Sequence, residues 1–241
     1  MTRGFVVVPR FCGPPRSGNG GYVSGRLAAF VDADVVEVTL RSPPPLNVPL
    51  VVVDEASGVL LYAGETLVAQ AHASVLDGEP PAAVDFATAV GAANRYAGRH
   101  DHPFPTCFVC GLDREPGDAM RLEPGAIGDG LVAAAWRPHK SLDGGSTSDG
   151  ELAQEYAWSA LDCPGGWAAG VAGRPMVLGR MTARVTSTPR PRQNYVVVGQ
   201  LRGTDGRKAF TSSALYSEDG ELLAAATATW LQIDPASVLP R

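Results

Sequence analysis

Two stretches of the chain, VTLRSPPPLNVPLVVV at residues 38–53 and ARVTSTPRPRQNYVVV at residues 183–198, share one layout. In each, a proline-rich bend separates two apolar runs, and aligning them places Pro44 on Pro189 and three valines on three valines. Each copy extends over about 100 residues, whereas solenoid repeats are roughly 20 to 50 residues long. The repeat therefore indicates a duplicated domain.

The predicted elements follow the same order in both copies. Apolar residues at helical spacing predict a helix over residues 22–31, with Asn19 placed to cap its first turn. A second helix is predicted from Glu151 to about Asp162, because the Pro and Gly residues at 164–166 stop helices. Alternating and β-branched residues predict strands at 5–8, 35–40, 49–53, 59–62 and 66–73, and again at 131–136, 177–186, 194–201, 208–216 and 222–233.

Three segments follow from this order. The first copy, with a connecting helix over residues 84–97, occupies residues 1–98; an irregular linker occupies 99–118; the second copy occupies 119–241. A single helix followed by an antiparallel meander is buried most economically when the sheet curls round the helix. The expected class is therefore α+β, with one helix and one antiparallel sheet in each copy.

Composition excludes several functional classes. The chain has 241 residues, 45% of them hydrophobic, and a net charge of -5 without a block of Lys and Arg, so nucleic acid is not an expected partner. No apolar run approaches the roughly 18 residues of a membrane span, so no membrane association is expected. Four cysteines are too few for a disulfide scaffold, and a cytoplasmic location with reduced thiols is expected.

The arrangement resembles the hotdog fold, and the duplication resembles a double hotdog, in which two antiparallel sheets, each curled round a central helix, join edge to edge as a pseudo-dimer. The resemblance covers nearly the whole chain outside the linker. The stretch Tyr156-Ala-Trp-Ser-Ala-Leu-Asp162 also resembles the end of a helix in type II double-hotdog acyl-CoA thioesterases. This resemblance implies an acyl-CoA or another acyl thioester as the ligand, hydrolysis as the reaction, and no cofactor.

The same resemblance assigns catalytic roles. It implies that Asp162 activates the hydrolytic water and that Thr182 corresponds to a threonine of the family site. The family's glutamine has no equivalent here, because the corresponding place holds Thr229. A structural alternative for Asp162, a carboxylate that bonds the backbone at the end of its helix, remains open. Asp149 and Glu155 are reserve candidates for the base, although a cap and a partly solvated helix residue are the favoured interpretations.

A helix N-terminus can hold the oxygen that gains negative charge in acyl transfer, because its N–H groups are unpaired and its dipole is positive there. Asn19, Gly20 and Gly21 suit that role, whereas many related single-domain thioesterases carry His before Gly-Gly. An ordinary capped helix is the alternative. Small residues along both helices leave room for an acyl chain. The expected substrate contacts are Asn19, Gly20, Gly21, Tyr22, Glu155 and Trp158.

The linker contains potential zinc ligands. Thiolate and imidazole are the usual set for a tetrahedral zinc site, and His100, His102, Cys107 and Cys110 supply four such groups. Their order matches no standard zinc module, so buried packing residues are the favoured interpretation, and a redox dithiol is a further alternative. Cys163, beside Asp162, lacks a local base and is expected to be structural, as is Cys12.

Three functional classes follow. The first is a thioester hydrolase without a covalent intermediate. The second is a binding module that keeps the acyl-CoA tunnel but not turnover, which the missing His and Gln equivalents favour. The third, a hotdog hydratase, needs an Asp followed five residues later by His, and no Asp here has that spacing. Exposed sheet edges would allow a homodimer of double hotdogs.

Overall fold

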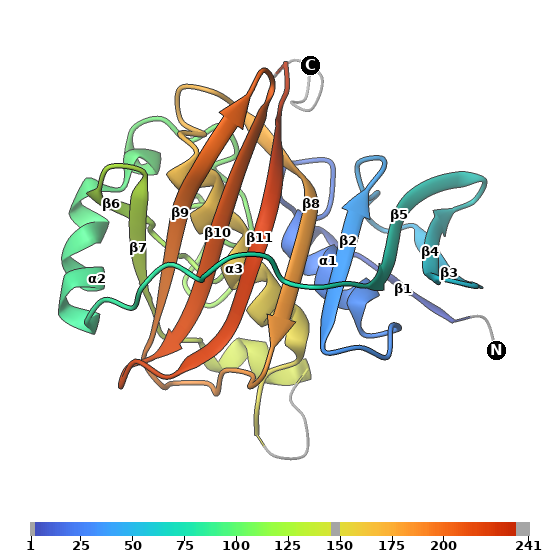
Figure 1. The fold of residues 1–241 in the computed structure, drawn as a ribbon, viewed down its shortest axis with the longest axis horizontal. Helices are drawn as coiled ribbons and strands as arrows, with labels where there is room; N and C mark the ends of the chain where they lie inside the picture. The colour runs from blue at the N-terminus through green and yellow to red at the C-terminus, as the bar shows by residue number, and fades with distance from the viewer. Residues whose placement is uncertain (1–2, 146–149, 235–241) are drawn as a thin grey trace.

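The computed structural model describes residues 3–145 and 150–234, which form a large antiparallel sheet with three α-helices (Figure 1). The helices are α1 (Gly20–Ala28), α2 (Phe86–Ala92) and α3 (Gln154–Ala168). The strands are β1 (Gly4–Val6), β2 (Val35–Leu40), β3 (Pro49–Glu55), β4 (Gly58–Ala63), β5 (Thr66–Ala73), β6 (Gly125–Gly128), β7 (Leu131–Trp136), β8 (Met176–Val185), β9 (Tyr195–Asp205), β10 (Lys208–Ser217) and β11 (Leu222–Gln232). None of the described helices is both long and apolar enough to cross a membrane.

The strands form a single sheet in the order β1-β3-β4-β5-β2-β8-β11-β10-β9-β7-β6. Strands of the first copy therefore lie on one side and strands of the second copy on the other, and they meet where β2 pairs with β8. In that pair Glu37 stands opposite Thr182, and these are positions that the sequence repeat aligns with each other. The α+β class is confirmed. The two predicted sheets are continuous because the edges of β2 and β8 are hydrogen-bonded.

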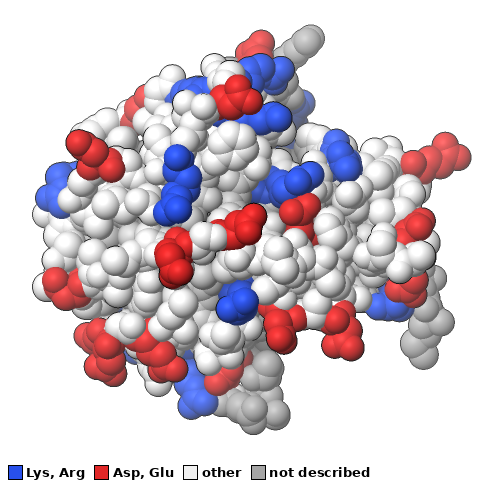
Figure 2. Space-filling model, viewed as in Figure 1, with Lys and Arg blue, Asp and Glu red and all other residues white. Residues whose placement is uncertain are grey.

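The two faces of this sheet are covered differently. Helices α1 and α3 pack on one face, and α2 covers the other face beside β7 and β9 (Figure 1). The segment at residues 74–85 crosses that second face in front of the strands, where the Tyr216 hydroxyl donates a hydrogen bond of 2.6 Å to the Pro81 carbonyl. On the face in view, Lys and Arg side chains are interspersed with Asp and Glu (Figure 2).

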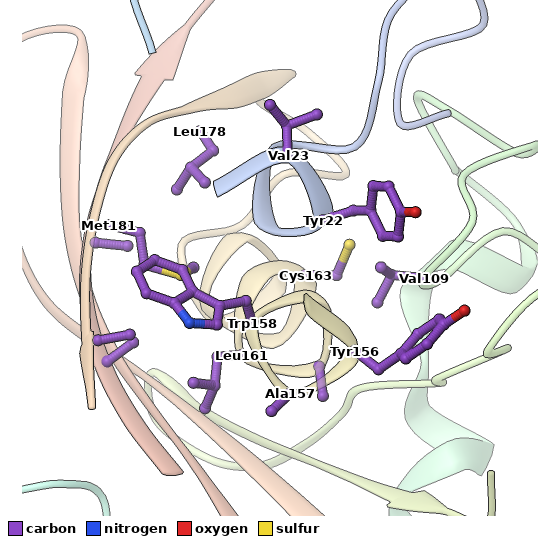
Figure 3. Close-up of a cluster of buried hydrophobic side chains, with 14 of the residues drawn as sticks. Tyr22, Val23, Val109, Tyr156, Ala157, Trp158, Leu161, Cys163, Leu178 and Met181 are labelled. Atoms are coloured by element: carbon purple, nitrogen blue, oxygen red, sulfur yellow. The ribbon is translucent and has the colours of Figure 1, made fainter. Parts of the chain in front are cut away.

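Helices α1 and α3 pack directly against each other through two glycines. A Cβ atom added to Gly21 would lie 2.6 Å from the Trp158 carbonyl oxygen, and one added to Gly25 would lie 2.6 Å from the Cα of Glu155. The small residues of the helices therefore allow close packing between α1 and α3 as well as against the sheet. In Figure 3, Trp158 points from α3 toward Met181 on β8, and both side chains are buried between the helix pair and the sheet.

The predicted end of the second helix was wrong. Helix α3 continues through Pro164 to Ala168, although Pro and Gly usually stop helices. Here the helix packs closely against the sheet: a Cβ on Gly199 of β9 would lie 2.3 Å from the Pro164 carbonyl oxygen, and one on Gly166 would lie 2.9 Å from the Trp230 ring. Tertiary packing therefore outweighs the local preference of this stretch. The connecting helix is also shorter than predicted, because α2 gives way to 3₁₀ turns over residues 93–99.

The helix contact predicts a position-specific effect of adding a methyl group. Gly25→Ala should lower the free energy of unfolding by about 1–3 kcal/mol, because the new Cβ overlaps the α3 backbone and forces the helices apart. Urea unfolding followed by tryptophan fluorescence measures this loss.

Gly91→Ala provides the matched control. Gly91 lies in α2 and an added Cβ would meet no atom within 4 Å, so the substitution should stabilise the chain by about 0.5–1 kcal/mol through the better helix propensity of Ala. Equal effects at the two glycines would contradict a close contact between α1 and α3.

Candidate functional site

A cavity of about 360 Å³ opens beside the N-terminus of α1 and the second half of α3. Both copies of the repeat contribute to its wall. Most of the lining is apolar, including Phe104, Leu178 and Trp230, whereas Asn19 and Asp162 are polar groups at the helix pair. A mostly apolar cavity with a few converging polar groups is the usual form of a small-molecule site.

Asp162 is held at this cavity by groups from the other copy. Its side chain is only 3% exposed, and its Oδ2 accepts hydrogen bonds from Asn19 Nδ2 at 2.8 Å and from the Gly21 N–H at 3.0 Å. Asn19 in turn caps α1, because its Oδ1 accepts from the Tyr22 N–H at 2.9 Å. The other carboxylate oxygen of Asp162, Oδ1, is buried and has no hydrogen-bond partner within the described parts of the chain.

Burial governs the charge of this carboxylate. The pKa of Asp162 is raised to about 7, mainly because burial removes solvent from the carboxylate. The hydrogen bond from the Gly21 N–H lowers this pKa, the nearby Cys107 raises it, and the hydrogen bond from the Asn19 amide lowers it. A carboxyl group with a pKa near neutrality can exist as a carboxylate and still accept a proton during a reaction. The surroundings of Asp162 thus suit an acid–base group.

Asn19, Gly20 and Gly21 were considered both as the cap of α1 and as the groups that hold the substrate oxygen. The cap is present, and Gly20 and Asn19 line the cavity. The N–H of Gly21, however, is bonded to Asp162 rather than directed toward a ligand. A side chain at Gly21 would collide with the Asp162 Cβ at 2.6 Å, so glycine is needed here for the approach of α3.

Three cysteine side chains gather beside Asp162. The Sγ atoms of Cys107, Cys110 and Cys163 all lie within 4.8 Å of one another, and the distance from Cys107 to Cys163 is 3.8 Å. Hydrogen bonds from the other two cysteines hold the pKa of Cys107 well below its usual value. Burial, foremost, raises the pKa of Cys110, and the hydrogen bond with Cys107 raises that of Cys163.

The four potential zinc ligands of the linker do not form one cluster among the described residues. His100 is exposed and does not line the cavity. His102 does line it, but its Nδ1 accepts from the Phe104 N–H at 3.0 Å and its Nε2 lies 3.2 Å from the Cys110 carbonyl oxygen. Within the described residues, the group with metal-ligand proximity is instead Cys107, Cys110 and Cys163. Sequence reasoning missed Cys163 because it lies 53 residues beyond Cys110 on a different element.

The structure does not bring the two predicted threonines to the cavity. Thr182 on β8 donates to Glu37 Oε2 at 3.2 Å, beside an ion pair of 3.3 Å between Arg180 and Glu37. Thr229 on β11 is half-buried and pairs in register with Arg180. Neither threonine is among the residues that line the cavity. The water-orienting partners that the resemblance implied therefore do not line the cavity that Asp162 lines.

Three of the expected substrate contacts lie elsewhere around the helix pair. Tyr22 stacks on Phe11 with ring centroids 4.0 Å apart. Glu155 forms an ion pair of 3.7 Å with Arg26, and Trp158 is buried in the core. None of the three lines the cavity. The reserve candidate Asp149 lies outside the described residues.

The bond between Asn19 and Asp162 predicts strong coupling in a double-mutant cycle. Asn19→Ala should destabilise the chain by about 2–4 kcal/mol, because it removes a helix cap worth about 1 kcal/mol and a bond to a buried charge worth about 1.5–3 kcal/mol. In an Asp162→Ala background, which has no oxygen to accept the bond, the same substitution should cost only the roughly 1 kcal/mol of the helix cap. Thermal and urea unfolding of the four proteins measure the coupling, and additive losses would contradict the bond.

Comparison with known proteins supports the fold. No family model matches the sequence, and no curated protein matches it either. Among solved structures, a provisionally assigned thioesterase from Novosphingobium aromaticivorans is 15% identical, with a TM-score of 0.61 over 96% of this chain and 95% of that one. The TesB protein of Mycobacterium avium subspecies paratuberculosis is 13% identical, with a TM-score of 0.57 over 96% and 92%. A conserved protein of unknown function from Alicyclobacillus acidocaldarius, described as having a hot dog fold, is 12% identical, with a TM-score of 0.56 over 94% and 91%. The fold of this chain is thus the hotdog fold in its double form.

Proposed function

We propose that this chain hydrolyses an acyl thioester, such as an acyl-CoA, with Asp162 as the general base. The observation that carries the proposal is the state of that side chain. One carboxylate oxygen is fixed by Asn19 and Gly21, the other is buried without a hydrogen-bond partner among the described residues, and Asp162 lines a mostly apolar cavity. A buried carboxylate is costly unless it is paired or used, and half of this one is left without a partner.

The proposed reaction places a water molecule on the unpaired Oδ1 of Asp162. Asp162 takes a proton from that water as the oxygen attacks the thioester carbonyl, and the proton passes to the departing thiolate when the tetrahedral intermediate collapses. The carbonyl oxygen gains negative charge at the N-terminus of α1, where the helix dipole is favourable and the Gly20 N–H is the first of the helix. Asn19 acts as a positioning residue, because it orients the carboxylate and caps the same helix.

The cavity wall suits the acyl part of such a substrate. Leu178, Trp230 and Phe104 supply apolar surface near the helix pair, and burying apolar groups there contributes binding free energy of roughly 25 cal/mol per Å². The polar thiol-bearing part would then extend toward the opening of the cavity.

We extend the proposal to a pseudo-dimer with one working site. Counting from the two helix N-caps, Asn19 corresponds to Ala153 and Asp162 corresponds to Ala28. At the opposite end of the helix pair, alanines therefore stand in the places that correspond to the Asn19 amide and the Asp162 carboxylate. One site per chain, built from Asn19 of the first copy and Asp162 of the second, fits this difference.

A binding module is the second candidate. Its support is that Thr182 and Thr229 do not line the cavity and that Thr182 donates to Glu37 instead. Such a module would take up an acyl thioester in the same cavity without cleaving it.

Asp162→Asn tests the proposal. The asparagine oxygen can accept the bonds from Asn19 and Gly21, but the amide cannot take a proton from water. Hydrolysis of acyl-CoA substrates of graded chain length should fall by about 10²- to 10⁴-fold, with binding of a non-hydrolysable acyl-CoA thioether retained. A thiol-reactive dye measures the release of coenzyme A, and calorimetry measures the binding.

Asp85→Asn is the matched control. Asp85 is an exposed carboxylate that caps α2, remote from the cavity lining, and Asn caps helices as well as Asp, so its hydrolysis rate should equal that of the wild type. Wild-type binding without thiol release at any chain length would favour the binding module. Full activity in Asp162→Asn would remove Asp162 from the mechanism.

A further inference from the structure

The cysteines at the cavity form a site that thioester hydrolysis does not use. Cys107, Cys110 and Cys163 are all buried free thiols, and all three line the cavity. They come from different parts of the chain: Cys107 and Cys110 from the linker between the copies and Cys163 from α3. Cys12, the fourth cysteine, is also buried, but it bonds the Thr106 carbonyl at 3.3 Å and does not belong to the group.

The spacing of the sulfur atoms fits a tetrahedral thiolate site. A zinc ion bound at about 2.3 Å from each sulfur requires sulfur atoms about 3.8 Å apart. The distance between Cys107 and Cys163 is 3.8 Å, and all three Sγ atoms lie within 4.8 Å of one another. Small side-chain rotations therefore suffice to place an ion among them.

The linker is held in this conformation by backbone hydrogen bonds. The Gly111 N–H donates to the Cys107 carbonyl at 2.9 Å, and the Phe108 N–H donates to the Cys12 carbonyl at 2.8 Å. Gly111 is required by this turn, because a Cβ there would lie 2.5 Å from the Cys107 nitrogen. The Tyr96 hydroxyl fixes the other end through a bond of 2.8 Å to the Cys110 carbonyl. Two of the three sulfur atoms are thereby positioned by the linker itself, and the third by a helix.

The fourth coordination position would face the cavity. His102 is nearby, but both of its ring nitrogens are engaged by backbone groups. Asp162 adjoins Cys163 and lines the same cavity, but its carboxylate does not belong to the group of mutually close ligand atoms. The cavity beside the three thiols therefore offers room for water as the fourth ligand.

We propose that Cys107, Cys110 and Cys163 bind a thiophilic divalent metal ion such as Zn²⁺, with the fourth position supplied by water from the cavity. Binding is a ligand exchange with no change of oxidation state: the ion loses water, each thiol loses its proton to solvent, and three metal–sulfur bonds form. Thiolate ligands select soft and borderline ions over Mg²⁺ and Ca²⁺. The ion would join the linker to α3.

The test uses the full chain, reduced and treated with a chelator. Addition of Zn²⁺ should give about one ion per chain by native mass spectrometry and raise the unfolding temperature, since an ion that binds the folded chain stabilises it. Co²⁺ should give the charge-transfer absorption of thiolate coordination. Cys107→Ser, Cys110→Ser and Cys163→Ser should each remove the absorption and weaken Zn²⁺ binding by more than about tenfold.

Cys12→Ser is the matched control, and it should bind Zn²⁺ as the wild type does. Competition between the wild-type chain and a chromophoric chelator gives the affinity even if a variant fails to fold. The proposal would be overturned if the wild type took up no Zn²⁺ or if Cys163→Ser left the uptake unchanged. It would also be overturned if the three cysteines bound no metal and an oxidant formed a disulfide among them. The number of Zn²⁺ ions bound per chain is measured without substrate. A chain that binds no Zn²⁺ would therefore overturn this proposal without testing the proposed hydrolysis.

Discussion

Helices α1 and α3 meet where Gly21 and Gly25 let the two backbones approach, and the cavity takes its form from that contact. A side chain at either glycine would overlap α3. With the helices this close, the first turn of α1 reaches Asp162, and the carboxylate accepts from both Asn19 and Gly21. The same contact places residues from the two copies of the repeat in one wall. A looser helix pair would leave Asp162 buried without donors, which costs several kcal/mol.

The polar groups at the cavity are therefore dependent on one another. Asn19 uses its oxygen to cap α1 and its amide to hold Asp162, while Cys107 lies 3.9 Å from the same amide nitrogen. Burial raises the pKa of the Asp162 carboxyl group, whereas the hydrogen bond from the Gly21 N–H lowers it. An unpaired buried polar group is costly, and natural proteins accept such costs at functional sites. Here the unsatisfied oxygen and the three thiols share one cavity.

Much of the architecture could be predicted from pattern. The alignment of Pro44 with Pro189 indicated a duplication, and in the structure the strands that flank this bend, β2 and β8, are the ones that join the two halves of the sheet. Alternation is a local property, so the main strands were predicted close to their observed positions. Strand β6 was missed, because its four residues, Gly-Ala-Ile-Gly, have almost no alternation. The end of α3 was missed because Pro164 is accommodated by packing against β9.

The sequence by itself determined that the chain contains two copies of one domain and at which positions the copies differ. It singled out Asn19 as a cap, since capping depends on near neighbours in the chain, and its resemblance to type II thioesterases pointed to Asp162. It did not determine that these two residues bond, that Cys163 joins Cys107 and Cys110, or that Thr182 and Thr229 stay away from the cavity. Those outcomes depend on how two helices cross and which face each strand presents. Contacts between residues more than 100 positions apart follow from tertiary packing, and only the folded chain decides them.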